Sequence, residues 1–306
     1  MAKNEMNKKT KGAWLIHHTK KLENVTGANS QYEQLDFAGK CGTMLNAIAN
    51  SDEQTLTNDQ VKALARANNI PTRTALPAIL GELQKQRLID QSHSGIGVLG
   101  LTSAKTLEHA ATIFEEAEAA SCELAVIDLS EQASELPLHE DDASEYISDS
   151  FSITRDETFE ILNHCQQIGF SDSENIDGKR LFFNGNLFRK EQIKKVKAVV
   201  GSLSSIEEGH LQAFSQKLST AGCIPKIEAQ RELGETLYAK LISIGFIDES
   251  AIGNESGIYQ FVTKPSAFSK FSDSIADDAF DLAKAFVTSL TFGMTSSSRS
   301  RGHITM

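Results

Sequence analysis

The sequence predicts a mainly α-helical protein with short β-hairpins, which places it in the α+β fold class. Three stretches indicate this: Pro71–Thr102, Thr154–Phe188 and Glu228–Val262. Each begins with apolar residues at helical spacing, reaches a helix stop, crosses a loop and returns as a short apolar strand. Because this order recurs, we expect one architecture that the chain uses three times.

The second of these stretches shows the order most clearly. Thr154 is a favourable residue for opening a helix, and Ile168–Phe170 ends that helix at a glycine. Asp177–Gly178 is a strong hairpin turn, and Leu181–Phe183 supplies the returning strand. A helix followed by a β-hairpin is therefore expected here.

The first stretch, together with the residues before it, predicts three helices and a hairpin. Asp36 is expected to cap the first helix and Thr57 to open the second. Thr72 or Thr74 opens the third, and the flexible loop Ser92–Gly97 then leads into a strand.

The third stretch follows a long predicted helix over Ser205–Ala221. A shorter helix is expected after Pro225 and another over Leu233–Ile244. Ile258–Val262 then forms a strand, and Ala276–Leu290 predicts one more amphipathic helix. The last residues are rich in Ser, Gly and Arg, so we expect either a fragment of a longer protein or a tail that orders on a partner.

Three helices followed by a two-stranded ribbon is the order of the winged helix, a variant of helix-turn-helix. Over residues 36–102, 143–188 and 205–265 the chain resembles the winged-helix superfamily, in tandem modules. We expect a basic N-terminal arm at 1–35, module 1 with a connecting helix at 36–121, an acidic linker at 122–142, module 2 with a basic helix at 143–200, module 3 at 201–270, and a C-terminal helix with a flexible tail at 271–306.

The net charge of −11 comes from one part of the chain. Residues 109–150 contain twelve carboxylates and no Lys or Arg, whereas the remainder is close to neutral. Within it, Ser130–Asp142 is acidic and rich in turn-forming residues, which favours a boundary between modules there. The negative net charge of the whole chain therefore does not exclude nucleic acid as a partner of the modules.

Composition favours a protein of the cytoplasm. No apolar run approaches the roughly 20 residues that span a bilayer, so we expect no membrane partner. The lysine-rich start is not followed by the apolar core of a secretory signal. The four cysteines lie far apart without a C-x-x-C pair, which favours free thiols over disulfides.

The sequence offers weak signals for cofactor or catalytic chemistry. Gly95–Gly100 matches the spacing of a dinucleotide-binding turn, but polar residues stand where that motif needs a strand, so we expect a flexible hairpin and no cofactor. His17–His18 and His164–Cys165 are adjacent pairs, a poor spacing for chelating a metal. No nucleophile motif is present, and we therefore expect no enzymatic activity.

Basic residues of modules 1 and 2 are the candidates for contact with double-stranded DNA. In a winged helix, the third helix enters the major groove and cations of the wing meet phosphates. The candidate DNA-binding residues are Thr72, Arg73, Thr74, Lys85, Arg87, Lys179, Arg180, Arg189, Lys190, Lys194, Lys195 and Lys197. The third helices of modules 2 and 3 are acidic, with Asp156, Glu157 and Glu160 in one and Glu228, Glu232 and Glu235 in the other, and are expected to face protein.

Three hypotheses follow. The first is a non-enzymatic DNA-binding protein with tandem winged helices, either a transcription regulator or the DNA-facing subunit of an assembly. The second is an interaction scaffold whose modules bind a protein partner or a second copy of the chain. The third is the N-terminal fragment of a larger enzyme.

Overall fold

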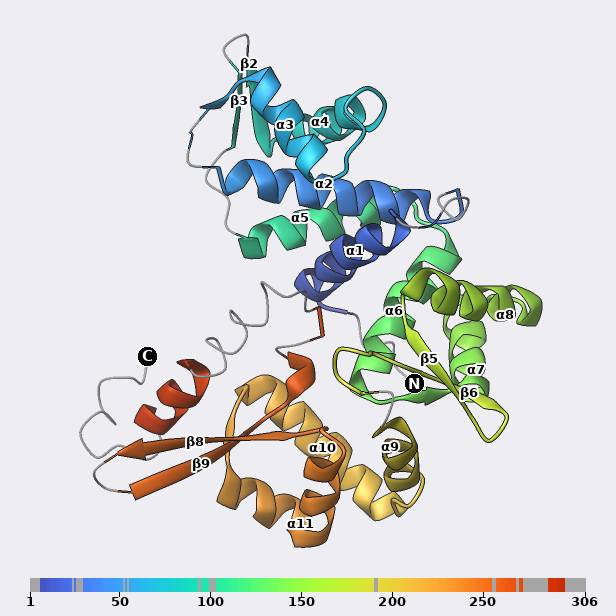
Figure 1. Cartoon of the computed structure of the whole chain (residues 1–306), viewed down its shortest axis with the longest axis vertical. Helices are drawn as coiled ribbons and strands as arrows, with labels where there is room; N and C mark the ends of the chain where they lie inside the picture. The colour runs from blue at the N-terminus through green and yellow to red at the C-terminus, as the bar shows by residue number, and fades with distance from the viewer. Residues whose placement is uncertain are drawn as a thin grey trace. The chain divides into compact units, whose positions relative to one another are not determined.

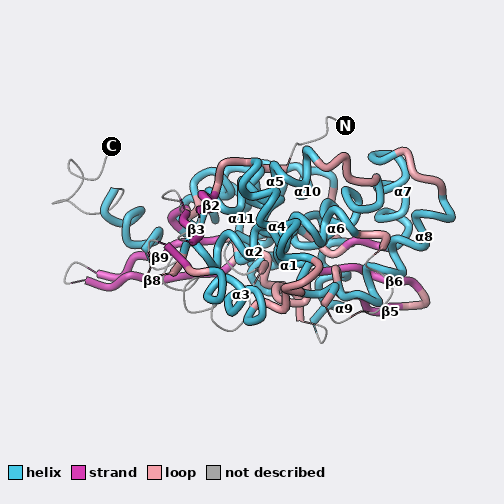
Figure 2. The backbone as a smooth tube through the Cα atoms, turned by 90° about the horizontal axis from the view of Figure 1, so that it is seen from above, coloured by secondary structure: helices cyan, strands magenta, loops and turns pink. Residues whose placement is uncertain are grey.

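The computed structural model describes residues 6–23, 25, 30–51, 53, 55–92, 95–98, 103–189, 192–254, 257–267, 270–271 and 286–294. Helices make up most of this backbone, and the strands form three small antiparallel sheets (Figures 1 and 2). The predicted fold class, mainly α with short β-hairpins, is confirmed at this level. None of the described helices is long and apolar enough to cross a membrane.

One order of elements occurs three times, namely a helix, a two-residue strand, two further helices and a hairpin; in the third repeat one interrupted helix takes the place of the two. The first repeat comprises α2 (Glu33–Ala49), β1 (Thr55–Leu56), α3 (Asn58–Ala67), α4 (Ala75–Lys85), β2 (Ile89–Ser92) and β3 (Gly95–Val98). The second comprises α6 (Ser121–Glu135), β4 (Leu138–His139), α7 (Glu140–Phe151), α8 (Arg155–His164), β5 (Asp172–Ile176) and β6 (Lys179–Phe183). The third comprises α10 (Ser205–Ala221), β7 (Ile224–Pro225), α11 (Lys226–Ser243), β8 (Asp248–Asn254) and β9 (Gly257–Thr263).

The remaining elements lie before, between or after the repeats, apart from one turn inside the second repeat. They are α1 (Lys8–Leu22), α5 (Ser103–Glu116), a π-helical turn at Cys165–Gly169, α9 (Ile193–Val200), a 3-10 turn at Pro265–Ala267 and a helix over residues 286–294.

The three sheets share one topology. In each, the second hairpin strand lies in the middle, flanked by the first hairpin strand and by the two-residue strand, giving the orders β1-β3-β2, β4-β6-β5 and β7-β9-β8. The predicted turn at Asp177–Gly178 is present between the paired Ile176 and Lys179. Both turn residues have positive φ, 55° and 82°, as a tight hairpin of this hand requires.

Capping boxes open one helix in each repeat. Thr57, Thr154 and Ser204 each accept a hydrogen bond from the backbone N–H three residues later, and the side chain of that later residue accepts from the backbone N–H of the cap. The predicted helix starts at Thr57 and Thr154 are thus confirmed. The predicted cap at Asp36 is wrong, because α2 already begins at Glu33 and Asp36 lies in its first turn, bonded to Lys40.

The predicted break in the third repeat is also present. Gly234 has φ 73° and ψ 157°, which interrupts α11 between a first part from Lys226 and a second part ending at Ser243. Residues other than glycine rarely adopt this backbone conformation, so the glycine itself determines where the helix breaks.

The described chain divides into two compact units. Unit 1 contains residues 1–131 and 140–171, and unit 2 contains residues 132–139 and 172–306. The helices α7 and α8 of the second repeat belong to unit 1, whereas its sheet β4-β6-β5 belongs to unit 2.

In unit 1, α1 packs against α2 and α5. Glycines permit the close approach, since a Cβ on Gly12 would lie 2.0 Å from the Leu107 carbonyl oxygen and one on Gly39 would lie 1.9 Å from Thr19 Oγ1. Trp14 and Leu15 are fully buried. The expectation of a basic arm at residues 1–35 is therefore wrong for the described part of that range, which folds into the core through α1.

Unit 2 has one apolar core shared by the second and third repeats. Leu181 and Phe183 of β6 lie in the same cluster as Val196 of α9, Phe214 of α10 and Leu241 of α11. The hairpin β5–β6 is therefore held by the same core as the third repeat.

The predicted acidic linker at 122–142 is wrong as secondary structure. Residues 121–135 form α6, whose buried side chains Ala125, Val126, Leu129 and Ala133 recur at helical spacing. Glu123 is buried, and its carboxylate accepts hydrogen bonds from the Leu35 and Ala120 N–H groups, both at 2.9 Å, which offset the cost of burial. The apolar stripe outweighs the turn-forming composition.

Candidate functional site

The turn between α3 and α4 holds three of the predicted site residues. Arg73 and Thr74 are exposed and Thr72 is half-buried, immediately before α4 begins at Ala75. Thr74 is the N-cap, although its side chain makes no capping hydrogen bond. The start of α4 therefore presents a guanidinium and hydroxyl groups to solvent.

The outer face of α4 is lined by small side chains. Pro77, Ala78 and Gly81 are exposed, and a Cβ built on Gly81 would meet nothing within 4 Å. The inner face carries Leu76, Ile79 and Leu83, all buried. The buried side of α4 packs on the core, and its exposed side carries small residues. Another molecule can therefore approach the backbone of α4 closely from the exposed side.

Arg87 lies just beyond the end of α4. It is exposed and has φ 58°, an uncommon conformation for a residue with a side chain. The turn is held by hydrogen bonds from Arg87 N to the Gln84 carbonyl oxygen and from Leu88 N to the Leu83 carbonyl oxygen, both 2.9 Å. The helix end is therefore closed, and its cation stands on the surface.

Charge in the first repeat is mildly positive. Residues 55–92 contain five Lys or Arg and three Asp or Glu. Asp59 and Glu82 are already paired with Lys62 and Lys85, at 3.4 and 3.1 Å. Three exposed arginines form no ion pair within the described residues: Arg66, Arg73 and Arg87. These arginines, rather than Lys85, are the available cations of this repeat.

The second repeat presents an acidic helix. Asp156, Glu157, Phe159 and Glu160 are exposed on α8, Phe159 by 56%. Hydrogen bonds from Thr154 hold the pKa of Glu157 below its usual range, which keeps this carboxylate charged. This face of α8 therefore presents negative charge to solvent.

The predicted basic residues of unit 2 lie on two neighbouring elements. Ile193 and Val196 bury one side of α9 in the cluster that contains Ile176 and Leu181 of the hairpin β5–β6. A 3.1 Å ion pair joins Lys197 to Asp177 in the hairpin turn. The structure thus brings α9 beside this turn.

The cations of these two elements differ in their availability. Lys194 and Lys195 are exposed on the outer side of α9, and Lys179 is exposed just after the hairpin turn. Arg180 is half-buried with its guanidinium 5.5 Å from the Phe182 ring. Arg189 is exposed before α9, and Lys190 lies outside the described residues. We refer to Lys179, Arg180, Lys194 and Lys195 as the α9 basic surface.

The acidity of the third repeat is partly internal. Glu228 and Glu232 of α11 both bind the ammonium group of Lys217 on α10. Only Glu235 of the three predicted acidic residues is exposed. The sequence count overstates the free negative charge on this helix, because charge pairing between helices cannot be read from spacing within one of them.

The glycine-rich stretch has a structural explanation. Gly95–Val98 forms β3, and a Cβ on Gly95 would lie 2.3 Å from the Leu56 carbonyl oxygen of the adjacent strand. Close strand pairing therefore requires this glycine. Leu99 and Gly100 lie outside the described residues.

His18 and Cys165 are buried in the core of unit 1. His18 is fully buried between Trp14 and Phe170, with ring centroids 5.2 and 4.4 Å away, and its Nε2 lies 3.1 Å from Ser130 Oγ. Burial raises the pKa of the Cys165 thiol to about 12, which keeps it protonated. All four cysteines are free, and no three described His, Cys, Asp or Glu side chains could hold a metal ion together.

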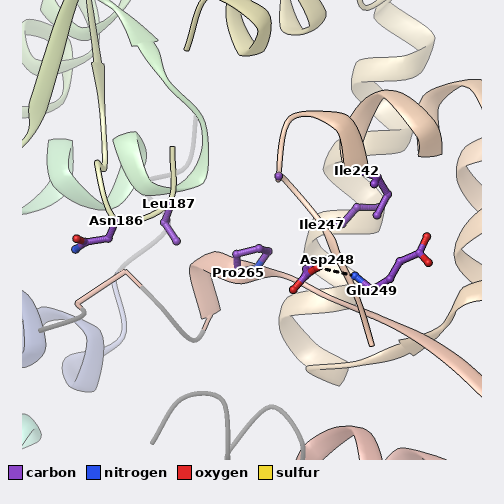
Figure 3. A pocket seen from close by; sticks show the side chains of 8 residues that line it. Asn186, Leu187, Ile242, Ile247, Asp248, Glu249 and Pro265 are labelled. Atoms are coloured by element: carbon purple, nitrogen blue, oxygen red, sulfur yellow. Dashed lines mark hydrogen bonds between the residues drawn. The ribbon is translucent and has the colours of Figure 1, made fainter. Parts of the chain in front are cut away.

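Unit 2 also contains a hollow of about 510 Å³ that the sequence did not indicate. It is lined by Asn186, Leu187, Ile242, Gly245, Ile247, Asp248, Glu249 and Pro265 (Figure 3). Glu249 is engaged elsewhere, since its carboxylate binds Lys226 at 2.9 Å and accepts a hydrogen bond from the Tyr238 hydroxyl at 2.6 Å. The hollow offers mostly apolar walls with little free charge.

The chain matches no known protein-family model, no curated protein and no solved structure. Its function is therefore inferred from its own residues.

Proposed function

We propose that this protein is a non-enzymatic binder of double-stranded DNA whose three repeats are tandem winged-helix modules. The shared order of helices and the identical order of strands in all three sheets support the winged-helix assignment. The observation that supports DNA binding is the surface of the first repeat. There the outer face of α4 carries small side chains, and the exposed arginines Arg66, Arg73 and Arg87 lie before and after this helix in the chain.

In this proposal α4 enters the major groove, which is about 12 Å wide and admits a helix. Small side chains at Ala78 and Gly81 let the helix backbone approach the base edges. Arg73 and Thr74 at the start of α4 reach bases, and Arg66 and Arg87 on either side bind phosphates. The base contacts specify the DNA sequence, and the phosphate contacts position the helix in the groove.

The α9 basic surface supplies a second set of phosphate contacts. Lys194 and Lys195 are exposed and lie beside a hairpin turn, the part of a winged helix that meets the backbone of DNA. The acidic face of α8 stays away from the duplex.

The test is duplex binding measured over a series of salt concentrations. We expect Arg87→Glu to weaken binding and to reduce the slope of log K against log salt by about 1, because one phosphate contact is lost. Arg73→Glu should weaken binding and relax the sequence preference, because a base contact is lost. Arg231→Glu is the matched control, since Arg231 is exposed on α11 and undergoes the same charge change. Lys194→Glu tests the second surface in the same way.

Absence of duplex binding at low salt would refute the proposal. Equal losses in the Arg73 and Arg231 variants would also refute the assignment of α4, because net charge alone would then explain the effect.

A protein-binding scaffold is the second candidate. Phe159 is 56% exposed within the acidic face of α8, and Phe286, Leu290 and Met294 are exposed along one side of the helix 286–294. Exposed apolar side chains that share one side of a helix, as these last three do, form a patch of the kind that protein partners cover. Both functions are compatible, because these residues do not overlap with α4.

A further inference from the structure

The central strand of the third sheet is paired on both sides over only part of its length. On one side, β8 pairs with all of β9, from Gly257 to Thr263. On the other side, β7 pairs only with Phe261 and Val262. In the described chain, no strand pairs with Gly257–Gln260 on the β7 side, and we call this segment the β9 edge. Figure 1 shows the hairpin β8–β9 extending beyond α11.

The geometry of the hairpin fixes which backbone groups are open. In an antiparallel ladder, successive residues direct their N–H and C=O groups to opposite neighbours. Asn254 and Gly257 close a two-residue hairpin, so Gly257 and Tyr259 bond to β8. Ile258 and Gln260 therefore direct their N–H and C=O groups to the β7 side, where Pro225 ends β7 and the chain turns into α11.

A hollow of about 360 Å³ lies beside these open groups. Its walls are Pro225, Lys226, Ile227 and Gln230 on one side and Ile258, Tyr259, Gln260 and Phe261 on the other. Ile227 is 80% exposed and Ile258 is 77% exposed. Two aliphatic side chains from different elements thus meet solvent in one hollow, next to unpaired backbone donors and acceptors.

The opposite face of the strand is already covered. The Tyr259 ring contacts Phe292 of the helix 286–294, with ring centroids 4.9 Å apart. An additional molecule therefore has access to the edge and the hollow rather than to this face.

The surface selects an uncharged occupant. Lys226 is the one charged residue lining the hollow, and its ammonium group is paired with Glu249 at 2.9 Å. A charged side chain placed here would lose water without gaining a partner. The corresponding overhang of β6 instead consists of Lys179 and Arg180, and charged residues are a usual protection of strand edges.

We propose that the β9 edge binds an extended, uncharged segment of a partner protein by strand addition. The segment lies antiparallel to β9 and in line with β7, its backbone bonds to Ile258 and Gln260, and one aliphatic side chain sits between Ile227 and Ile258. Backbone hydrogen bonds then give affinity, and the hollow selects the side chain. This site is independent of α4 and does not depend on DNA binding.

The probe is a display library of random ten-residue peptides selected on the full chain. We expect selected peptides to alternate polar residues with Val, Ile or Leu and to contain few charges. Synthetic copies of them should lose at least tenfold in affinity for Ile227→Asp. Ile206→Asp is the matched control, because Ile206 is 72% exposed on α10 and undergoes the same change outside the hollow.

A second variant tests the backbone contact. Gln260→Pro removes the N–H group that points away from β8 and keeps the β8 pairing, so it should also weaken binding at least tenfold. Retained affinity in both variants, or failure to select any peptide, would overturn the proposal. A wild-type dimer that either variant converts to a monomer in sedimentation would also overturn it, since a second copy would then occupy the edge.

Discussion

His18 makes the stability of unit 1 dependent on pH. Its ring is fully buried between Trp14 and Phe170, and its Nδ1 has no hydrogen-bond partner within the described chain. Burial lowers the pKa of His18 well below its ordinary value of 6.5, and the neighbouring charges of His17 and Lys21 act in the same direction. The folded protein therefore holds the neutral imidazole.

The sign and size of the effect follow from proton linkage. Because the unfolded chain binds this proton more readily, stability is complete above pH about 6.5 and falls as the pH drops toward the folded-state pKa. Each pH unit within that window costs about 1.4 kcal/mol for one proton. Between pH 7.5 and pH 5.0 we therefore expect unit 1 to lose up to about 2 kcal/mol through His18.

Trp14 provides the assay. It is the single tryptophan of the chain, it is buried, and its Nε1 donates to Glu131 at 2.7 Å, so its fluorescence reports on unit 1. Urea unfolding is measured at several pH values for the wild type and for His18→Leu. The readout is the change of stability with pH, so any packing loss caused by leucine cancels.

The exposed residue His210 gives the control. His210→Leu should leave the pH dependence unchanged, whereas His18→Leu should flatten it above pH 5. Equal slopes for the wild type and His18→Leu would refute the assignment, and so would a wild type that becomes more stable as the pH falls.

Two further predictions concern local stability. Thr57→Ala should destabilise unit 1 by about 1 kcal/mol, because the α3 capping box is lost, and an unchanged urea midpoint would contradict this. In unit 2, Lys264 has a 3% exposed side chain that binds Glu135 and donates to Ser215 Oγ at 2.8 Å. Glu135→Ala should cost about 3 kcal/mol, because it leaves a buried ammonium group unpaired, whereas Lys264→Met should be near neutral; the reverse order would show that the pair itself stabilises the fold.

Short local signals were readable from the sequence. Thr57 and Thr154 open helices because their side chains bond to backbone groups three residues away. Asp177–Gly178 forms a hairpin turn, because few residues other than Gly, Asn and Asp adopt positive φ. These features depend on a few adjacent residues, so spacing alone predicts them.

Features that depend on distant residues were not readable. A strand of two residues such as Ile224–Pro225 has no periodicity and exists because β9 lies beside it. The N-terminal lysines resembled a mobile arm, yet Lys8 binds Glu115 at 2.9 Å in the structure.

The candidate site shows the same difference between features set by adjacent residues and features set by distant ones. The sequence indicated every cation considered for DNA contact except Arg66. Pairing of Lys85 with Glu82 and of Lys197 with Asp177 then changes which of these cations are available. The sequence did not indicate that Ile227 and Ile258 line one hollow, because their proximity depends on where β7 ends.

The division of the second repeat affects how the chain can be made and cut. The chain passes between the two units after residues 131, 139 and 171, so residues 132–139 are synthesised before unit 1 is complete, while their partner strand β6 follows only at residue 179. A fragment ending at residue 171 would contain β4 but not β6. A fragment beginning at residue 172 would contain β6 but not β4. Neither fragment can form the sheet β4-β6-β5, so a fragment that keeps this sheet must span the whole region from α6 to β6.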